Sequence, residues 1–339
     1  MKLKNKIKKK GFLFLIFAFF FGKISFLSPG SINLEQANKL ENGSKEIEKT
    51  LVFAVSPNPL LLKALGSNVL VKKNIPEVIS QSSQFKCSWA SFTSTNNKTI
   101  DFCTHPFKDI VSGHIRRKHR WPDCDILPQI WNNEKKNETS IYIEIGANIG
   151  SCVMEMLLST DANIIAFEPH PMNQFNLLST VAKLPKEYKS RFLLYPIGLG
   201  NVKMNTTIYS AQNNMGNSNL GKFIEDYGSQ TSKKELQFQV HVDLIKNVLR
   251  LDEINVPLMK MDAQGFECRI LEGMGSPQAK KIKNIKFEYA KKWLDNQNCE
   301  DFLPRLRNFD FKVTLQNGKE VLTDNPNFKL KEMIAKKQK

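Results

Sequence analysis

From residue 141 to residue 315, short β-rich runs alternate with helical segments, and this alternation limits the possible folds more than any other feature of the chain. Strands that alternate with helices form a mostly parallel sheet with helices on both faces, and the crossovers between parallel strands are right-handed. The sequence therefore predicts a doubly wound α/β domain over residues 141–325. The expected strands are 141–145, 163–167, 192–195, 236–242, 258–261, 285–288 and 311–315, and the expected helices are 149–158, 171–184, 266–274 and 299–308.

A glycine-containing turn follows the first expected strand. Ligands of an open parallel sheet bind at the carboxyl ends of its strands, where glycines let the backbone approach a ligand and the start of a helix offers free N–H groups. Glu168 follows the second strand, where its carboxylate can accept hydrogen bonds from both hydroxyls of a ribose. Together these features predict a site for a nucleoside-containing cofactor. The candidate contacts in the turn are Glu144, Gly146, Ala147, Asn148 and Gly150.

The spacing of the glycines separates two classes of cofactor. Dinucleotide sites carry G-x-G-x-x-G, whereas this turn reads G-x-x-x-G and lacks the central glycine that makes room for a pyrophosphate. Glu144 would also repel a pyrophosphate, but a carboxylate there suits the ammonium and sulfonium groups of S-adenosylmethionine. We therefore expect S-adenosylmethionine as the cofactor.

Four blocks of sequence resemble the FkbM family of methyltransferases, in the family's order and spacing, over residues 141–311. Gln264 stands where the family's third block typically has a glutamate, although a glutamine can still form hydrogen bonds. The blocks are I-E-I-G-A-N-I-G at 143–150, A-F-E-P-H-P at 166–171, L-M-K-M-D-A-Q-G-F-E at 258–267 with L-E-G at 271–273, and F-E at 287–288.

The resemblance implies methylation of a hydroxyl oxygen and a Rossmann-like class I methyltransferase sheet with an antiparallel terminal hairpin. Methyl transfer requires an aligned acceptor oxygen, and a base that takes the hydroxyl proton aids the attack. Asp262, after the strand 258–261, is the first candidate for orienting the acceptor or the methionine part of the cofactor. Glu288 and then His241 are the next catalytic candidates. The alternatives are caps or loop hydrogen bonds for the carboxylates and a strand surface for His241. Lys260 and Lys286 are expected to be solvated.

Two other functions fit parts of the sequence. An inactive methyltransferase-like protein that binds a glycan or lipid would explain Gln264, but the other turn residues and Glu168 are intact. An NAD-dependent oxidoreductase is disfavoured by the glycine spacing. No His or Cys cluster has the spacing of metal ligands, so we expect no metal site. No Asn/Asp-Pro-Pro-Tyr motif occurs, so we expect a sugar, lipid or small-metabolite acceptor and no nucleic acid.

The N-terminus combines six lysines in residues 1–10 with an apolar run at 12–22. This order is typical of a signal anchor or a cleaved signal peptide. We expect residues 1–28 to be a cytoplasmic basic tail and membrane anchor, with secretion after cleavage as the alternative. The positive end then lies in the cytoplasm, so the catalytic domain faces the lumen or exterior as in a single-pass type II protein. Sequons at Asn42, Asn97, Asn137 and Asn205 agree with a glycoprotein.

Three further segments complete the expected organisation. Residues 29–85 read as a stem or linker, 86–140 as an irregular lead-in rich in cysteine and aromatic residues, and 326–339 as a basic C-terminal tail. Of the six cysteines, the first three are placed to fasten the lead-in to the domain, while Cys152 and Cys268 are expected to be buried thiols. The net charge of +16 is concentrated at the two ends. Residues 116–120 (R-R-K-H-R) form a solvated loop or a contact for an anionic surface.

Overall fold

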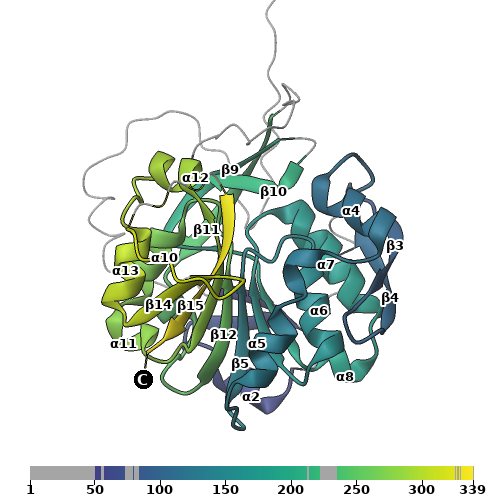
Figure 1. The fold of residues 1–339 in the computed structure, drawn as a ribbon. Coiled ribbons are helices and arrows are strands. Elements are labelled where there is room, and N and C mark those ends of the chain that lie inside the picture. The colour runs from purple at the N-terminus through teal and green to yellow at the C-terminus, as the bar shows by residue number, and fades with distance from the viewer. Residues whose placement is uncertain are drawn as a thin grey trace, which may run out of the picture. The chain divides into compact units, whose positions relative to one another are not determined.

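The computed structural model describes residues 50–54, 57–72, 79, 84–211, 214–221, 235–324, 326, 328 and 330–338. Their centre is a nine-stranded sheet with the order β14-β15-β13-β12-β5-β6-β7-β1-β2 (Figure 1). The five inner strands from β13 to β7 pair in parallel, which confirms the predicted mostly parallel α/β sheet. These strands are β5 (Ser140–Ile145), β6 (Asn163–Phe167), β7 (Phe192–Tyr195), β12 (Asn255–Met261) and β13 (Asn284–Ala290).

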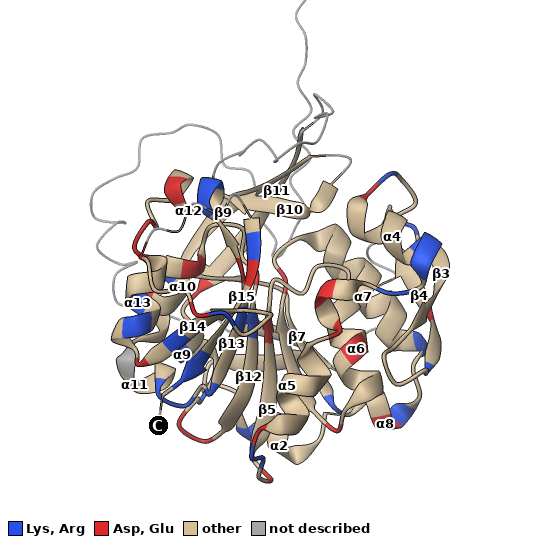
Figure 2. Ribbon diagram, viewed as in Figure 1, with Lys and Arg blue, Asp and Glu red and all other residues tan. Residues whose placement is uncertain are grey.

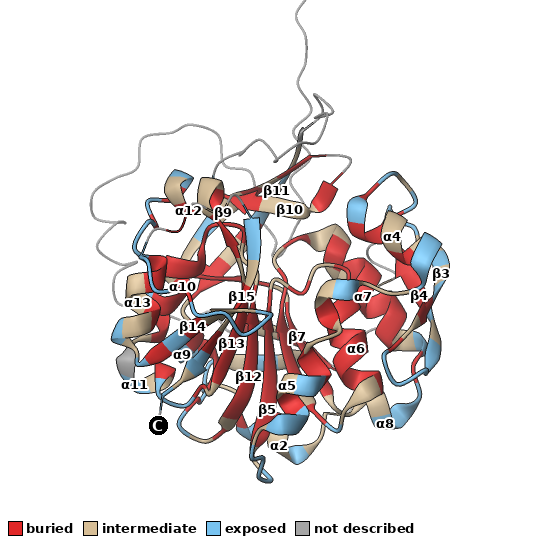
Figure 3. Cartoon of the chain, viewed as in Figure 1, coloured by how far each residue is buried: buried red, intermediate tan, exposed pale blue. Residues whose placement is uncertain are grey.

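Helices cover both faces of this sheet, and alternate side chains of each strand serve the two faces. One face packs on α5 (Leu127–Asn133), α6 (Ser151–Ser159) and α7 (Pro171–Lys183), and the other on α10 (Glu267–Met274) and α13 (Phe302–Asn308). Figure 3 shows the buried residues concentrated in the strands and on the inner sides of these helices. The remaining helices are α2 (Pro59–Lys63), α8 (Lys186–Lys189), α9 (Ile245–Val248), α11 (Ser276–Ala279) and α12 (Lys291–Asn296).

The C-terminal residues form an interior strand, so the prediction of a basic tail at 326–339 was wrong. Strand β15 (Leu330–Lys337) lies between β13 and β14 (Phe311–Leu315) and is antiparallel to both. Met333 and Ala335 are fully buried, while Lys331 and Lys336 are exposed and Lys337 is half-buried. Figure 2 shows that β15 carries both acidic and basic residues. The antiparallel terminal hairpin implied by the resemblance is confirmed.

Part of the expected stem also belongs to the sheet. Strand β1 (Thr50–Ala54) pairs antiparallel with β7, and β2 (Val69–Lys72) pairs parallel with β1. Val52 and Ala54 are fully buried because they pack into the cores beside β7. The reading of residues 29–85 as a stem therefore does not hold for 50–72, and residues 1–49 lie outside the described part of the chain.

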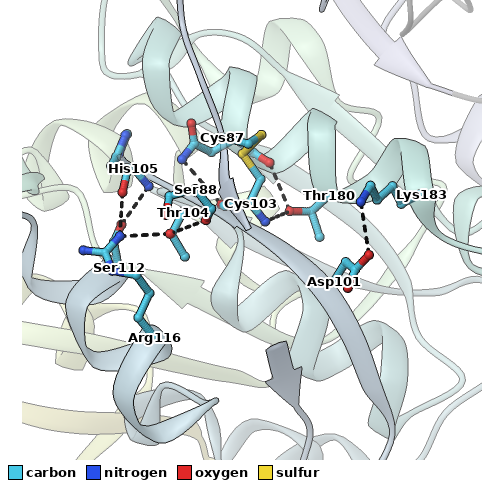
Figure 4. Close-up of a disulfide and its surroundings, with 11 residues drawn as sticks. Cys87, Ser88, Asp101, Cys103, Thr104, His105, Ser112, Arg116, Thr180 and Lys183 are labelled. Atoms are coloured by element: carbon cyan, nitrogen blue, oxygen red, sulfur yellow. Dashed lines mark hydrogen bonds and ion pairs between the residues drawn. A yellow bond between two sulfur atoms is a disulfide. The ribbon is translucent and has the colours of Figure 1, made fainter. Parts of the chain in front are cut away.

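The lead-in at 86–140 is regular, which corrects the expectation of an irregular segment. It contains a hairpin of β3 (Ser88–Thr93) and β4 (Thr99–Thr104), the helix α4 (Ile110–Lys118), a 3-10 turn η1 (Pro122–Cys124) and α5. Figure 4 shows β4 seated on α7, where the backbone N–H of Cys103 donates to Thr180 Oγ1 at 3.0 Å. Of the basic residues 116–120, Arg116 donates to backbone carbonyls and Arg120 pairs with Asp125, so these two are engaged within the fold.

A second, four-stranded sheet has the order β10-β9-β11-β8. The expected strand at 236–242 exists as β11, but it pairs here and not in the main sheet. β9 and β10 were not predicted, because their sequences lack a clear alternation of apolar residues. The strands are β8 (Gly198–Leu199), β9 (Met204–Ala211), β10 (Asn214–Leu220) and β11 (Glu235–Asp243).

All six cysteines form disulfides, in the pairs Cys87–Cys103, Cys124–Cys152 and Cys268–Cys299. The second pair fastens the lead-in to α6, as anticipated for a bridge from this region. The expectation that Cys152 and Cys268 are plain thiols was wrong, because each lies in the first turn of a helix that packs against another cysteine-bearing segment. The predicted membrane anchor falls on residues outside the described part, and no described helix is both long and apolar enough to cross a bilayer.

Candidate functional site

A cavity of about 60 Å³ lies at the carboxyl ends of β5, β6 and β12. Its lining has a polar part and an apolar part, called here the polar wall and the apolar wall, so the cavity suits a ligand with a flat apolar part and a polar part. The polar wall contains four predicted residues, Gly146, Asn148, Glu168 and Asp262, together with Asn173 and Gln264. The apolar wall consists of Ile145, Phe167, Ile197, Leu199, Ile208, Met215, Leu220, Phe266 and Ile270.

Glu168 is the most constrained carboxylate of the cavity. Its Oε1 accepts hydrogen bonds from His170 N at 2.9 Å and Asn173 Nδ2 at 3.3 Å, and its Oε2 accepts from Asn148 N at 2.6 Å. A carboxylate offers about four lone-pair positions, so one remains, on Oε2. Glu168 can therefore accept one ligand hydroxyl in addition to its present partners, and not the two that the sequence suggested. Burial raises the pKa of Glu168 to about 7, although these hydrogen bonds oppose the shift.

The two glycines of the turn lie where the chain packs so closely that a side chain would collide with its neighbours. Gly146 has φ +79°, and a Cβ there would lie 1.9 Å from the backbone oxygen of Asp262. Gly150 has φ +93° and caps α6, where a Cβ would lie 2.3 Å from Leu177 Cδ1. Ala147 donates its N–H to Phe167 O at 3.0 Å. Ala147 and Gly150 do not line the cavity, so they shape the turn around Gly146 and Asn148.

Glu144 lies behind the cavity wall and not on it. Its carboxylate accepts a hydrogen bond from Tyr142 Oη and pairs with Lys260, whose Nζ lies 3.2 Å from Oε1. Both side chains are buried, with exposed fractions of 1% for Glu144 and 7% for Lys260. The expectation that Lys260 is solvated was therefore wrong. In this structure Glu144 neutralises a lysine and does not face the position expected for the cofactor.

Lys260 joins Glu144 to Asp262, because its Nζ is also 3.2 Å from Asp262 Oδ2. Burial lowers the pKa of Lys260, but the carboxylates of Asp262 and Glu144 outweigh this effect and raise it overall. Asp262, with a side chain 28% exposed, lines the cavity as predicted. Lys260 thus stays charged and fixes the direction of the Asp262 carboxylate.

Gln264 links Asp262 to Glu288. Its Nε2 lies 2.5 Å from Asp262 Oδ1 and 3.4 Å from Glu288 Oε2, while its buried Oε1 has no hydrogen-bond partner among the residues that the structure describes. A glutamate at this position would place a third carboxylate against the other two, whereas the amide donates to both. The unpartnered Oε1 is available to accept a hydrogen bond from a ligand in the cavity.

Glu288 lies at the end of β13, beside the cavity. Burial, and then the carboxylates of Asp262 and Glu332, raise the pKa of Glu288 well above its usual range. The nearby Lys286 is fully buried, against the expectation that it is solvated, and pairs with Glu332. Within the described residues no lysine or arginine pairs with Glu288, so this carboxyl group is the one of the cluster best suited to hold a proton.

His241 is not brought to the cavity. It lies on β11, its Nδ1 is 3.0 Å from Asn205 Oδ1, and its Nε2 is 3.7 Å from Asp243. The strand that carries it belongs to the second sheet, so the catalytic role suggested for His241 has no support in the geometry. In the described part of the chain, no group of three or more His, Cys, Asp or Glu residues is arranged to hold a metal ion.

Sequence reasoning missed Asn173 and the part of the wall that comes from the second sheet. The signal for Asn173 is its place in the first turn of the helix that follows Glu168, on the same ligand-facing edge. Ile208, Met215 and Leu220 carry no such signal, because their position depends on how β9 and β10 pair over the cavity.

A model of the methyltransferase FkbM domain matches residues 144–313, half of the chain. The chain belongs to the FkbM methyltransferase family. The match begins at Glu144 and covers the turn, Glu168, the Asp262 segment and Glu288. A search of curated proteins finds no match to this FkbM methyltransferase.

Several solved structures are similar to this FkbM methyltransferase at low sequence identity. The precorrin-6y C5,15-methyltransferase of Geobacter metallireducens is 12% identical, with 62% of this chain and 86% of that chain covered and a TM-score of 0.32. The S-adenosylmethionine-dependent O-methyltransferase of Thermotoga maritima is 8% identical, with 77% of this chain and 82% of that chain covered and a TM-score of 0.33. Pyrococcus horikoshii TYW2 in complex with MeSAdo is 12% identical, with 74% of this chain and 70% of that chain covered and a TM-score of 0.34.

Replacing Lys260 by methionine in this FkbM methyltransferase should lower the free energy of unfolding by about 3–5 kcal/mol, because Glu144 is left buried without a counter-charge. Urea denaturation measures the loss. The matched control combines Lys260→Met with Glu144→Gln, which removes both charges and keeps an acceptor for Tyr142 Oη. This double variant should recover most of the stability. Equal losses in the two proteins would show that the ion pair is not the cause.

Proposed function

We propose that this FkbM methyltransferase uses S-adenosylmethionine to methylate a hydroxyl oxygen of a sugar, lipid or small metabolite. The observation that carries the proposal is the cavity at the carboxyl ends of β5, β6 and β12, which is lined by Glu168 with its free lone pair and by an apolar wall. A ribose hydroxyl fits the carboxylate, and an adenine ring fits the apolar wall. Gln264 also lines the cavity, and its Oε1 provides a further acceptor.

The cofactor, when bound, supplies an electrophilic methyl group on a sulfonium. The residues of this chain then have two tasks, to place the acceptor hydroxyl and to take its proton. Asp262, held by Lys260 and Gln264, is fixed in direction and faces the cavity, so it suits the first task. Glu288 suits the second when it is ionised, because a carboxylate with a raised pKa binds a proton more tightly than an ordinary glutamate does. In that role Glu288 would accept the proton of the acceptor hydroxyl.

Isothermal titration of the purified full-length chain should detect S-adenosylmethionine and S-adenosylhomocysteine but not NAD. Replacing Glu168 by alanine should weaken binding of both sulfur nucleosides by about 1–3 kcal/mol, the usual cost of an unpaired polar partner. Glu187→Ala, at an exposed glutamate of α8, is the matched control and should leave affinity unchanged. Binding of NAD alone would identify an oxidoreductase, and binding of neither class by a folded chain would favour the inactive glycan- or lipid-binding protein.

The pKa of Glu168, about 7 because of burial, also predicts how affinity depends on pH. A hydroxyl that donates to Glu168 favours the ionised carboxylate, so affinity for S-adenosylhomocysteine should rise as the pH increases from 5.5 to 7.5. Below pH 7 it should fall by up to about tenfold for each pH unit. His170 stays neutral throughout, because burial lowers its pKa to about 3. Titrations of Glu168→Gln should show a flatter profile, and an identical slope in both proteins would assign the effect to another group.

We further propose that the catalytic domain works in the lumen or outside the cell. Disulfides persist in oxidising compartments, and all six cysteines are paired. The sequons at Asn97, Asn137 and Asn205 lie on exposed residues, where an oligosaccharide can be attached.

Expression of the full-length chain in eukaryotic cells tests this localisation. Endoglycosidase should lower the apparent mass of the protein, and mutation of all four sequons, Asn42 included, to Gln-x-Ser/Thr should abolish that shift. Thiol alkylation without reduction should label no cysteine in the native protein. An unglycosylated chain with reactive cysteines would place the domain in the cytoplasm.

A further inference from the structure

The lead-in, residues 86–140, precedes the matched family domain yet contacts the proposed donor site. Its strand β4 lies on α7, the helix that begins directly after Glu168, as Figure 4 shows. Lys183 at the end of this helix forms an ion pair with Asp101 at 3.1 Å. The backbone N–H of Cys103 donates a hydrogen bond to Thr180 Oγ1, in the last turn of the helix. The lead-in is therefore fixed along one side of α7, close to the first turn that faces the cavity.

His105, at the end of β4, reaches that first turn. Its side chain is 1% exposed, and Nε2 lies 3.0 Å from Asn173 Oδ1. Asn173 Nδ2 in turn donates to Glu168 Oε1 at 3.3 Å. Because the amide nitrogen of Asn173 faces the carboxylate, its oxygen faces His105, and Nε2 of the imidazole must carry the proton. The three side chains form one directed chain of donors and acceptors.

The position of His105 is fixed by its neighbours. Its backbone N–H donates to Ser112 Oγ at 3.1 Å, and its carbonyl oxygen accepts from Arg116 at 2.6 Å. The imidazole stacks on Phe107 with ring centroids 4.9 Å apart. Burial lowers the pKa of His105, against the opposing effects of Asp109 and Asn173, so the ring remains neutral and keeps a single N–H donor.

The lead-in also contacts the apolar wall of the cavity. Asp109 caps α4 by accepting from Ser112 N at 2.9 Å, and its other oxygen accepts from Met215 N at 3.1 Å. Met215 belongs to β10 and lines the cavity. The lead-in thus connects to both the polar and the apolar wall.

We propose that His105 is a positioning residue for donor binding, which acts through Asn173 to orient the Glu168 carboxylate toward the ribose. The inference rests on the proposed function, since it assigns Glu168 to a donor hydroxyl. Its physical basis is that the Asn173 amide is held at both ends, with Oδ1 at His105 and Nδ2 at Glu168. Without the imidazole N–H, the buried Oδ1 of Asn173 loses its donor, and the side chain can rotate toward another donor. Glu168 Oε1 would then lose the Asn173 hydrogen bond, and the carboxylate would be held less firmly in its direction.

The test compares two ligands in the wild type and three variants, with S-adenosylhomocysteine and its 2′,3′-dideoxy analogue titrated into the full-length chain. His105→Leu should weaken S-adenosylhomocysteine binding by about tenfold, the cost of one misdirected hydrogen bond to a charged group, but leave binding of the dideoxy analogue nearly unchanged. His105→Gln keeps an N–H donor and should restore most of the affinity. His114→Leu, on α4 but outside the network, should match the wild type.

An equal loss for both ligands would show that His105 only supports the fold, and no loss would remove it from the donor site. If the wild type binds neither ligand, the proposed function itself fails. A measurement on the wild type covers the case in which His105→Leu does not fold. In a ¹⁵N-histidine spectrum at pH 7.5, His105 should be the neutral Nε2–H tautomer, and its signal should shift on addition of S-adenosylhomocysteine. A protonated ring, or an unchanged signal with bound ligand, would overturn the proposal.

Discussion

The buried ammonium group of Lys260 holds together the ends of the two central strands, and the site depends on this contact. Lys260 on β12 neutralises Glu144 on β5, so neither charge is stable in the interior without the other. The same cation turns Asp262 toward the cavity. At this point the backbone of Gly146 comes so close to the oxygen of Asp262 that no side chain fits. Charge neutralisation and close backbone approach therefore fix the same pair of strand ends.

Covalent links hold the helices that start at these strand ends. Cys152 lies in the first turn of α6, directly after Gly150, and is bonded to the lead-in. Cys268 lies in the first turn of α10, after the Asp262 segment, and is bonded to the segment before α13. The cavity walls are thus attached to parts of the chain distant in sequence. Rigid support of this kind keeps a binding site in shape without the ligand.

Short-range patterns in the sequence predicted those features of the structure that depend on residues close to one another in the chain. The strand, glycine turn and helix at 141–158, the position of Glu168, and Asp262 at a strand end all follow from short-range spacing. Pairing between distant segments could not be predicted: β1 joins β7, β11 leaves the main sheet, and Lys260 is buried because Glu144 lies on the neighbouring strand. The lysines of β15 suggested a solvated tail. In the folded chain, only two apolar residues of this strand are fully buried.

The place of β15 has a consequence for folding. This strand follows both of its neighbours in the sequence, yet it separates β13 from β14 in the sheet. β14 therefore joins the nine-stranded sheet only through a strand that comes later in the chain. Until β15 pairs, β13 presents an open sheet edge, which is exposed to chaperones and to aggregation.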